Sequence, residues 1–297
     1  MTQRRAIRYC HILLLIAAAL VVSCASEAST PRETRTVPTL LPTAALVSPA
    51  PADDPTQDTT PDQEHSPPDT GWMPGDSGIE LRRLQVDPGD GRLPFPVVIV
   101  RLDPSQVRLR VAYSPQEPRS IASWFELRRP LLAINGAFFT PEYAATALVI
   151  SDGVVSGSSY EGFGGMLAVS PGDEVTLWPL RDVPYDPSVP LAQAVQSFPM
   201  LVFPGGSAAQ VEDNGQRARR TAVAIDRSGR VLFIVSPTSG FSLRELAEWL
   251  AGADLEIDRA LNLDGGSSTG LYLSAGPLQE QIESFGPLPI VILAEPR

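Results

Sequence analysis

The sequence predicts one mixed α+β domain, rich in strands and poor in helices, that follows a disordered tether. Three observations indicate this class. Short apolar or alternating runs, separated by glycine, proline and aspartate turns, recur through residues 79–297, as is typical of strands. Few stretches in this region carry a helical pattern. The region is long enough for one core and has no proline-rich break, so we expect a single domain.

The predicted strands are short and are bounded by turn residues. Apolar and polar residues alternate from 107 to 113, which turns one face of that strand inward. A hairpin is predicted where two apolar runs flank the turn at residues 226–229. The strands that we expect are 97–102, 107–113, 131–134, 166–169, 221–225, 231–235 and 260–263.

One helix has clear boundary signals. Ser242 can cap the first turn while Glu245 completes a capping box, and the apolar residues of 243–250 face inward until Gly252 ends the helix. A shorter helix is expected around residues 121–127. A third helical turn is expected at 190–195, directly after a proline. Strands therefore outnumber helices, which favours an α+β fold.

Residues 1–23 have the pattern of a lipoprotein signal peptide. Three arginines precede an apolar run, residues 12–22, that is too short to span a bilayer as a helix. The run ends just before Cys24, in a stretch that resembles the lipobox of bacterial lipoproteins. We expect Cys24 to carry a diacylglyceryl group, which would make the chain an extracytoplasmic lipoprotein anchored to a membrane.

The alternative for this end of the chain is free secretion after a cut near Ala28. The cysteines favour the lipid anchor, because Cys10 lies in the segment that would be removed. Cys24 would then have no partner in the mature chain, and no intrachain disulfide could form.

Residues 24–78 are expected to form a disordered tether. Pro, Thr, Ala, Asp and Ser dominate this segment, and no apolar period is sustained, so it cannot bury enough surface to offset the entropy of ordering. About 50 such residues would reach at least ~40 Å, enough to hold residues 79–297 clear of a membrane. The formal net charge of -11 disfavours nucleic acid as a partner.

Several kinds of chemistry are excluded by the residues that the expected domain lacks. His11, His65 and both cysteines precede residue 79, and all 23 basic residues of the chain are arginines. This excludes Ser-His-Asp and Cys-His catalysis, histidine-based zinc sites, Schiff-base chemistry and a phosphate-loop lysine. Carboxylates, hydroxyls, amides, arginines and backbone N–H groups remain, and they suffice for glycosyl transfer and phosphate binding.

Three segments combine these groups at expected strand ends. Asp264 follows the strand 260–263 and opens a run of glycines and hydroxyl residues that lets the backbone approach a ligand. Asn135 ends another strand and could hydrogen-bond a sugar hydroxyl. Arg219 and Arg220 alternate on a third strand, so one of them can face a cleft while the other faces solvent. Taken singly, the Asp264 segment and the Asn135 segment would more often be ordinary structural turns.

The segments together resemble the phosphodiester glycosidase family. The matching stretches keep the family's order across most of the expected domain, and the ordered set is more specific than any one of them. Ala137 stands where the family usually has a second glycine, and the last loop lacks a third glycine after Gly266, which bears on how many backbone donors face a ligand. The stretches are residues 134–139, 196–201, 220–226 and 261–269.

The resemblance implies a hydrolase that cleaves a sugar-1-phosphate diester at the glycosidic bond and releases free sugar and a phosphate monoester. A phosphate leaves as a stable anion, so the reaction depends on an arginine that holds it. By the family's motif that arginine is Arg220, and Asp264 is the candidate base or nucleophile. The substrate oxygens would be bound by Asn135, Asn262, Gly265, Gly266, Ser267, Ser268 and Thr269. Asp226 is interpreted as structural, and Glu161 as a candidate second carboxylate.

Two other functions remain open at this stage. A binding module could hold phosphorylated glycan of the cell envelope in the same cleft without turnover. A phosphodiesterase would attack at phosphorus instead, normally with a divalent cation held by several carboxylates. The sequence shows no obvious cluster of such ligands, and we expect no required cofactor and no metal ligands, although a calcium or magnesium ion beside Asp264 stays open.

Overall fold

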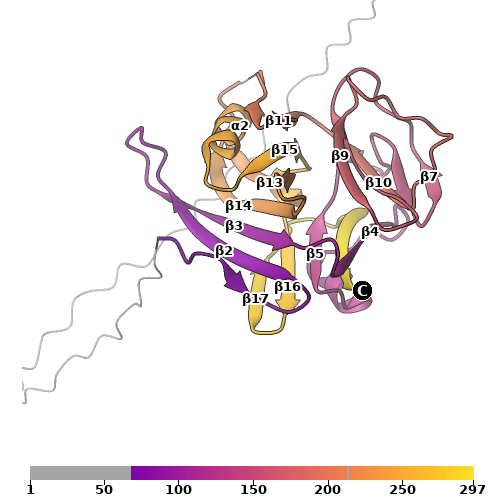
Figure 1. Cartoon of the computed structure of the whole chain (residues 1–297), viewed down its shortest axis with the longest axis horizontal. Helices are drawn as coiled ribbons and strands as arrows, with labels where there is room; N and C mark the ends of the chain where they lie inside the picture. The colour runs from indigo at the N-terminus through magenta and orange to yellow at the C-terminus, as the bar shows by residue number, and fades with distance from the viewer. Residues whose placement is uncertain (1–67, 213) are drawn as a thin grey trace, which may run out of the picture. The chain divides into compact units, whose positions relative to one another are not determined.

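The computed structural model describes residues 68–212 and 214–297. The predicted signal peptide, Cys24 and residues 24–67 of the predicted tether lie outside the described residues. The described residues form a strand-rich fold (Figure 1), in which two α-helices accompany three antiparallel sheets. The α+β class predicted from the sequence is confirmed. Within the described ranges, no helix is long and apolar enough to cross a membrane.

The largest sheet has eight strands in the order β1-β2-β3-β14-β13-β15-β11-β12. Its central pair, β13 and β14, is the predicted hairpin. The strands are β1 (Met73–Pro74), β2 (Ile79–Val86), β3 (Phe95–Leu102), β11 (Met200–Phe203), β12 (Ser207–Ala208), β13 (Ala218–Asp226), β14 (Val231–Phe241) and β15 (Ile257–Asn262).

Two five-stranded sheets complete the fold. One has the order β7-β6-β10-β8-β9, with β6 (Val149–Ser151), β7 (Val154–Ser156), β8 (Gly165–Val169), β9 (Val175–Pro179) and β10 (Gln193–Ser197). The other has the order β17-β16-β5-β18-β4, with β4 (Val107–Tyr113), β5 (Leu132–Asn135), β16 (Leu271–Ala275), β17 (Leu278–Ile282) and β18 (Ile290–Pro296). The helices are α1 (Ile121–Arg128) and α2 (Leu243–Gly252), and a 3-10 turn, η1, spans Gly266–Ser268.

The two faces of β13 pack into different parts of the core, as strand alternation requires. Val223 belongs to a large apolar cluster that also draws residues from β5, β8, β16 and β18. Ala222 and Ala224 belong to a second cluster, which the apolar face of α2 covers. Figure 1 shows α2 beside β11 and β15. Successive residues of β13 therefore point to opposite sides of the largest sheet.

The turn of the β13–β14 hairpin is built by Asp226, as interpreted from the sequence. Its Oδ1 accepts the backbone N–H groups of Ser228 and Arg230, both at 2.9 Å, and its Oδ2 pairs with the Arg230 Nε at 2.7 Å. Gly229 closes the turn at φ +82°, a conformation that favours glycine. Asp226 is thus occupied in forming the turn.

The predicted third helical turn at residues 190–195 is wrong. Residues from Gln193 onward form β10, which pairs with β8 on one side and β6 on the other. Ala194 and Val195 are completely buried between these neighbours. The local sequence favours a helical turn after a proline, but pairing on both sides fixes the extended conformation.

The composition of the sequence placed the start of the domain at residue 79. Contacts of the folded unit begin earlier than that. Asp69 pairs with Arg82 at 2.6 Å, and β1 pairs with β2. Arg101 lies 3.7 Å from the ring centroid of Trp72. The residues from 69 to 74 therefore pack against the edge of the largest sheet.

Helix α2 begins with the predicted capping box. The Ser242 Oγ accepts the Glu245 N–H at 3.2 Å, and the Glu245 Oε2 accepts the Ser242 N–H at 2.8 Å. These two bonds satisfy donors that a helix start otherwise leaves open.

Ser242→Ala is expected to lower the free energy of unfolding by about 1 kcal/mol, because one arm of the capping box is lost. Urea denaturation monitored by circular dichroism measures it. Ser228→Ala is the control, since this exposed serine contributes its backbone N–H to the hairpin turn. Equal midpoints for the two variants would contradict the capping role.

Candidate active site

Two of the predicted site segments meet at the end of β15. The Asp264 N–H donates to the Gly136 carbonyl at 3.0 Å, and the Asn135 Nδ2 donates to the Asp264 carbonyl at 2.7 Å. Residues far apart in the sequence are therefore joined at one place, beside the start of β13. This is the candidate site that the segments were predicted to form.

Asn135 holds this junction together. Its Oδ1 accepts the Thr221 hydroxyl at 2.8 Å and the Gly270 N–H at 3.1 Å, while its Nδ2 donates to the Asp264 carbonyl. The residue is only 1% exposed. Its amide group is thus directed at protein atoms, which makes it a positioning group for the Asp264 turn. The sequence had suggested a direct contact with a sugar hydroxyl.

The glycines after Asp264 are needed for the shape of the turn. A Cβ on Gly265 would lie 2.8 Å from the Arg219 carbonyl, so β13 approaches too closely for any side chain. Gly266 has φ +59°, in the left-handed region. The pair lets the chain pass β13 and enter η1 directly after the carboxyl.

The Asp264 carboxyl is half-buried inside this turn. Its Oδ1 accepts the Gly265 N–H at 2.8 Å. Burial raises the pKa of Asp264 above its ordinary value, and hydrogen bonds from Ser268 and the Gly265 N–H oppose the rise. A carboxyl group with a raised pKa in a glycine-rich turn is suited to proton transfer or nucleophilic attack.

The hydroxyl residues that follow differ in accessibility. Ser267 is exposed, and its carbonyl accepts the Phe285 N–H at 2.8 Å. Ser268 is 7% exposed, and Thr269 is completely buried, with its Oγ1 accepting the Thr221 hydroxyl at 3.3 Å. Ser267 is therefore the member of this run that a ligand can reach most directly, whereas Thr269 belongs to the Asn135 junction.

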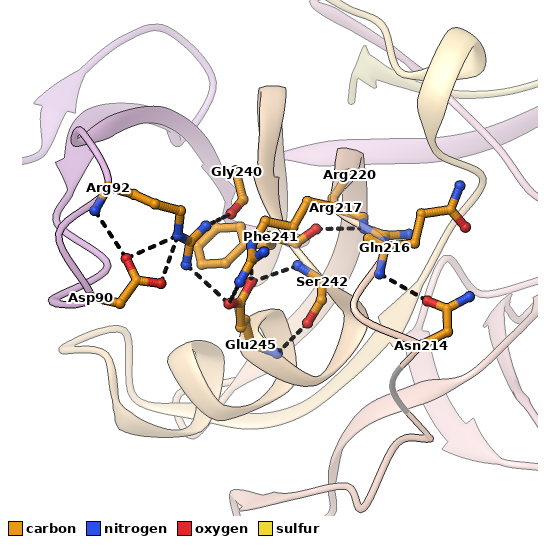
Figure 2. A network of polar contacts seen from close by, with 10 residues as sticks. All are labelled: Asp90, Arg92, Asn214, Gln216, Arg217, Arg220, Gly240, Phe241, Ser242 and Glu245. Carbon is orange, nitrogen blue, oxygen red and sulfur yellow. Dashed lines mark hydrogen bonds and ion pairs between the residues drawn. The ribbon is translucent and has the colours of Figure 1, made fainter.

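Arg220 lines a cavity of about 330 Å³ on the α2 side of β13. Its Nε donates to the Phe241 carbonyl at 3.2 Å and its Nη2 to the Gln216 carbonyl at 2.8 Å. Figure 2 shows these bonds beside Glu245, which accepts from both Arg92 and Arg217. The other lining residues are Glu212, Asn214, Gln216 and Leu243. The side chain is half-buried and anchored by backbone oxygens.

Arg219 is on the opposite face of the strand, as predicted, but the expectation that this face meets solvent is wrong. Arg219 is 8% exposed, and its Nη2 donates to the Glu283 carbonyl at 2.7 Å. Its guanidinium lies 4.1 Å from the ring centroid of Phe285. The Nε and Nη1 atoms have no hydrogen-bond partner among the described residues, and desolvation lowers the pKa of Arg219. The segment after β17 covers this side chain.

Asn262 shares the face of β15 that pairs with Ala222, on the α2 side of the sheet. Its Nδ2 donates to the Phe198 carbonyl at 2.8 Å. Its Oδ1 is buried, and so is the Ser197 Oγ, and neither has a hydrogen-bond partner in the described part of the chain. Buried polar atoms are normally paired, so these two atoms are exceptions at the ends of β15 and β10.

Sequence reasoning missed an aromatic group beside Asn262. The ring centroids of Phe163 and Phe198 are 6.0 Å apart, and both rings contact Tyr160. Phe138 joins the group through Phe198 at 4.8 Å. Phe198 stood in one of the matching stretches, and Phe163 in the glycine-rich stretch 156–165, but no local pattern showed that they meet. The neighbouring Glu161 is exposed.

Across residues 68–212 and 214–297, no three carboxylate, histidine or cysteine side chains lie close enough to hold a metal ion. The site brings together the Asp264 carboxyl, the Asn135 amide and the backbone N–H groups of the turn, while Arg220 lines its own cavity and Asn262 is bonded to the Phe198 carbonyl. This set can hold hydroxyl and phosphate oxygens and can move a proton.

The fold, this site and the family match define a glycosidase-type hydrolase whose substrates are phosphodiester sugars. The chain belongs to the phosphodiester glycosidase family, because the family's sequence model matches residues 129–289, more than half of the chain. The resemblance stated from the sequence is thereby confirmed. No curated protein matches the chain in sequence.

Solved structures share the fold at low sequence identity. The catalytic domain of zebrafish N-acetylglucosamine-1-phosphodiester alpha-N-acetylglucosaminidase, auto-inhibited by its pro-peptide, has a TM-score of 0.59 and 17% identity over 76% of this chain and 88% of that chain. A hypothetical protein from Synechocystis has a TM-score of 0.56 and 18% identity over 78% of this chain and 64% of that chain. A putative exported protein from Burkholderia pseudomallei K96243 has a TM-score of 0.50 and 15% identity over 68% of this chain and 74% of that chain.

Proposed function

We propose that the protein hydrolyses a sugar-1-phosphate diester at the glycosidic bond and releases the free sugar and a phosphate monoester. The observation that carries this proposal is the Asp264 carboxyl, which is desolvated in a turn pinned by Asn135 and bonded to the Gly265 N–H. Such a group can deprotonate water or attack the anomeric carbon. The bond that breaks joins this carbon to the bridging phosphate oxygen, and that oxygen leaves with the phosphate.

Arg220 is the proposed ligand of the departing phosphate. Two backbone carbonyls fix its guanidinium at the wall of a cavity, so the group is oriented before a substrate arrives. Negative charge on the phosphate grows as the glycosidic bond breaks. A fixed cation at that place therefore stabilises the transition state more than the ground state.

The proposed place of action is the cell envelope. The support is in the sequence, where a signal-peptide pattern precedes Cys24. A lipid on Cys24 and a tether of about 50 residues would keep the hydrolase near envelope glycans that carry phosphate. Replacing Cys24 with serine and fractionating the cells tests the anchor; a variant that stays in the salt-washed membrane pellet would argue against it.

Hydrolysis of a diester panel in ¹⁸O-labelled water tests the reaction. The panel starts with N-acetylglucosamine 1-phosphate diesters, since the zebrafish relative is named for that linkage. Cleavage at carbon leaves the phosphate monoester unlabelled, and that is the expected result. Labelled phosphate would identify a phosphodiesterase, and a chelator arm would show whether it needs a metal ion. Binding without any product would identify a binding module.

Arg220→Ala is expected to raise KM and to lower kcat, with a combined loss in kcat/KM of about 10²–10³-fold, as for removal of one transition-state donor. Steady-state kinetics on the cleaved diester measures it. Arg227→Ala is the matched control, because this exposed arginine lies in the turn at the other end of the same strand. Equal losses in the two variants would show that bulk charge, rather than the position of Arg220, matters.

A further inference from the structure

The aromatic group beside Asn262 is unusually accessible for large apolar rings. Phe163 is 49% exposed and Phe198 is 40% exposed, although each contacts other rings of the group. Most rings of this size are buried in a core, and adjacent exposed ones mark a surface that binds something.

The two exposed rings line a cavity of about 670 Å³. Its walls come from the loop before β8, from β11 and β12, and from the start of α2. The cavity is mixed in character, since Arg181, Gln210 and Glu212 line it together with apolar residues. Glu212 and Leu243 also line the cavity of Arg220, so the two cavities adjoin. A ligand in the larger cavity can therefore extend toward the arginine.

The loop that carries Phe163 is held in place before any ligand binds. The Gln196 Oε1 accepts the Tyr160 N–H at 2.8 Å, and its Nε2 donates to the Ser159 hydroxyl at 2.8 Å. A Cβ on Gly164 would lie 2.5 Å from the Ser197 carbonyl. This glycine, at φ +74°, lets the loop close against β10. The fold therefore holds the two rings in position before a ligand binds.

Polar side chains in the wall of the larger cavity fit a ligand with hydroxyls. The Phe198 carbonyl is bonded to Asn262, two residues before Asp264. In the wall of the cavity itself, Arg181, Gln210 and Glu212 supply charged and amide groups. An apolar tail would offer these side chains no hydrogen-bond partner, whereas sugar hydroxyls can pair with all three.

We propose that Phe163 and Phe198 form the platform on which the sugar ring of the diester stacks, with its anomeric carbon toward the Asp264 turn and its phosphate toward Arg220. The inference rests on the proposed function for the identity of the ligand. A pyranose has one face of C–H groups, which an aromatic ring can cover, and a rim of hydroxyls, which needs polar partners. The cavity offers both kinds of contact.

The experiment uses the full chain with Phe163→Ala, Phe198→Ala and the ring-retaining Phe163→Tyr and Phe198→Tyr. Saturation-transfer NMR with glucose, mannose, galactose and N-acetylglucosamine detects stacking of the ring C–H groups, and octyl phosphate probes an apolar tail instead. Leu93→Ala is the control, because this residue is 86% exposed in the loop between β2 and β3. Melting curves show that each variant is folded.

We expect at least one sugar to give a ring C–H signal that both alanine variants lose and both tyrosine variants keep. On a cleaved diester, KM of the alanine variants should rise about 5- to 150-fold, which corresponds to the loss of about 1–3 kcal/mol that removing an aromatic stacking partner causes. Alanine variants with unchanged sugar signals and KM would overturn the platform. A ring-dependent signal from octyl phosphate, with no signal from any of the sugars, would overturn it too. If no diester were hydrolysed, only the proposed function would be contradicted. The sugar platform would still be tested, because the NMR signals of the sugars do not require turnover.

Discussion

Asp264→Asn is expected to lower kcat by about 10²–10⁴-fold, the usual contribution of a positioned acid or base. Asparagine keeps the size of the side chain and can still accept the Gly265 N–H, but it cannot carry the charge that a base or nucleophile needs. The contact with Asn135 uses the Asp264 backbone carbonyl, so the junction is retained. Binding of the intact diester should change little. Single-turnover kinetics separates the chemical step from binding.

The same variant makes a prediction about pH and stability. Because burial raises the pKa of Asp264 in the folded state, ionisation of this group costs stability. The wild type should therefore lose stability, relative to Asp264→Asn, as pH rises through the folded pKa. Below the unfolded pKa of about 3.9, both proteins carry a neutral group and the stability difference should no longer depend on pH. Melting temperatures of both proteins from pH 3 to 8 measure this.

A variant that kept near-normal turnover would remove Asp264 from the mechanism. Parallel loss of activity and melting temperature would do the same, since it would show that the carboxyl merely holds the turn. The stability expected for the asparagine variant at neutral pH is equal to or above that of the wild type. Residues at active sites commonly cost stability, because their environment is arranged for reaction rather than for folding.

Local patterns in the sequence were enough to predict the elements that depend on neighbouring residues. The β13–β14 hairpin follows from two apolar runs around a turn that Asp226 builds, and α2 follows from its capping box. Residues 190–195 were misread because their conformation depends on β6 and β8, which are distant in the sequence. The sequence could not show this pairing.

In the candidate site, too, local patterns predicted some features, whereas others depend on residues that are distant in the sequence. The family resemblance implied that Asn135 and Asp264 belong to one site, and the hydrogen bond from the Asn135 Nδ2 to the Asp264 carbonyl joins the two segments. Strand alternation placed Arg219 and Arg220 on opposite faces, but it could not show that Phe285 covers Arg219. The contact of Phe163 with Phe198 likewise arises only when the loop before β8 folds against β10.

Asn135→Ala is expected to lower the free energy of unfolding by about 3 kcal/mol, because three polar groups of the junction each lose a hydrogen bond at once. These groups are the Thr221 hydroxyl, the Gly270 N–H and the Asp264 carbonyl. Activity should fall as well, since the Asp264 turn loses its fixed position. Urea denaturation and kinetics on the same preparation measure both effects.

Asn214→Ala is the matched control for stability alone, because this exposed asparagine accepts one hydrogen bond, from the Gln216 N–H at 2.9 Å, and also lines the Arg220 cavity. It should lose less than about 0.5 kcal/mol, as surface substitutions usually do. The contrast with Asp264→Asn separates two roles, because loss of the reacting group lowers activity alone, whereas loss of the positioning group lowers activity and stability together. If Asn135→Ala kept its stability and lost only sugar binding, Asn135 would contact the ligand directly, as the sequence first suggested.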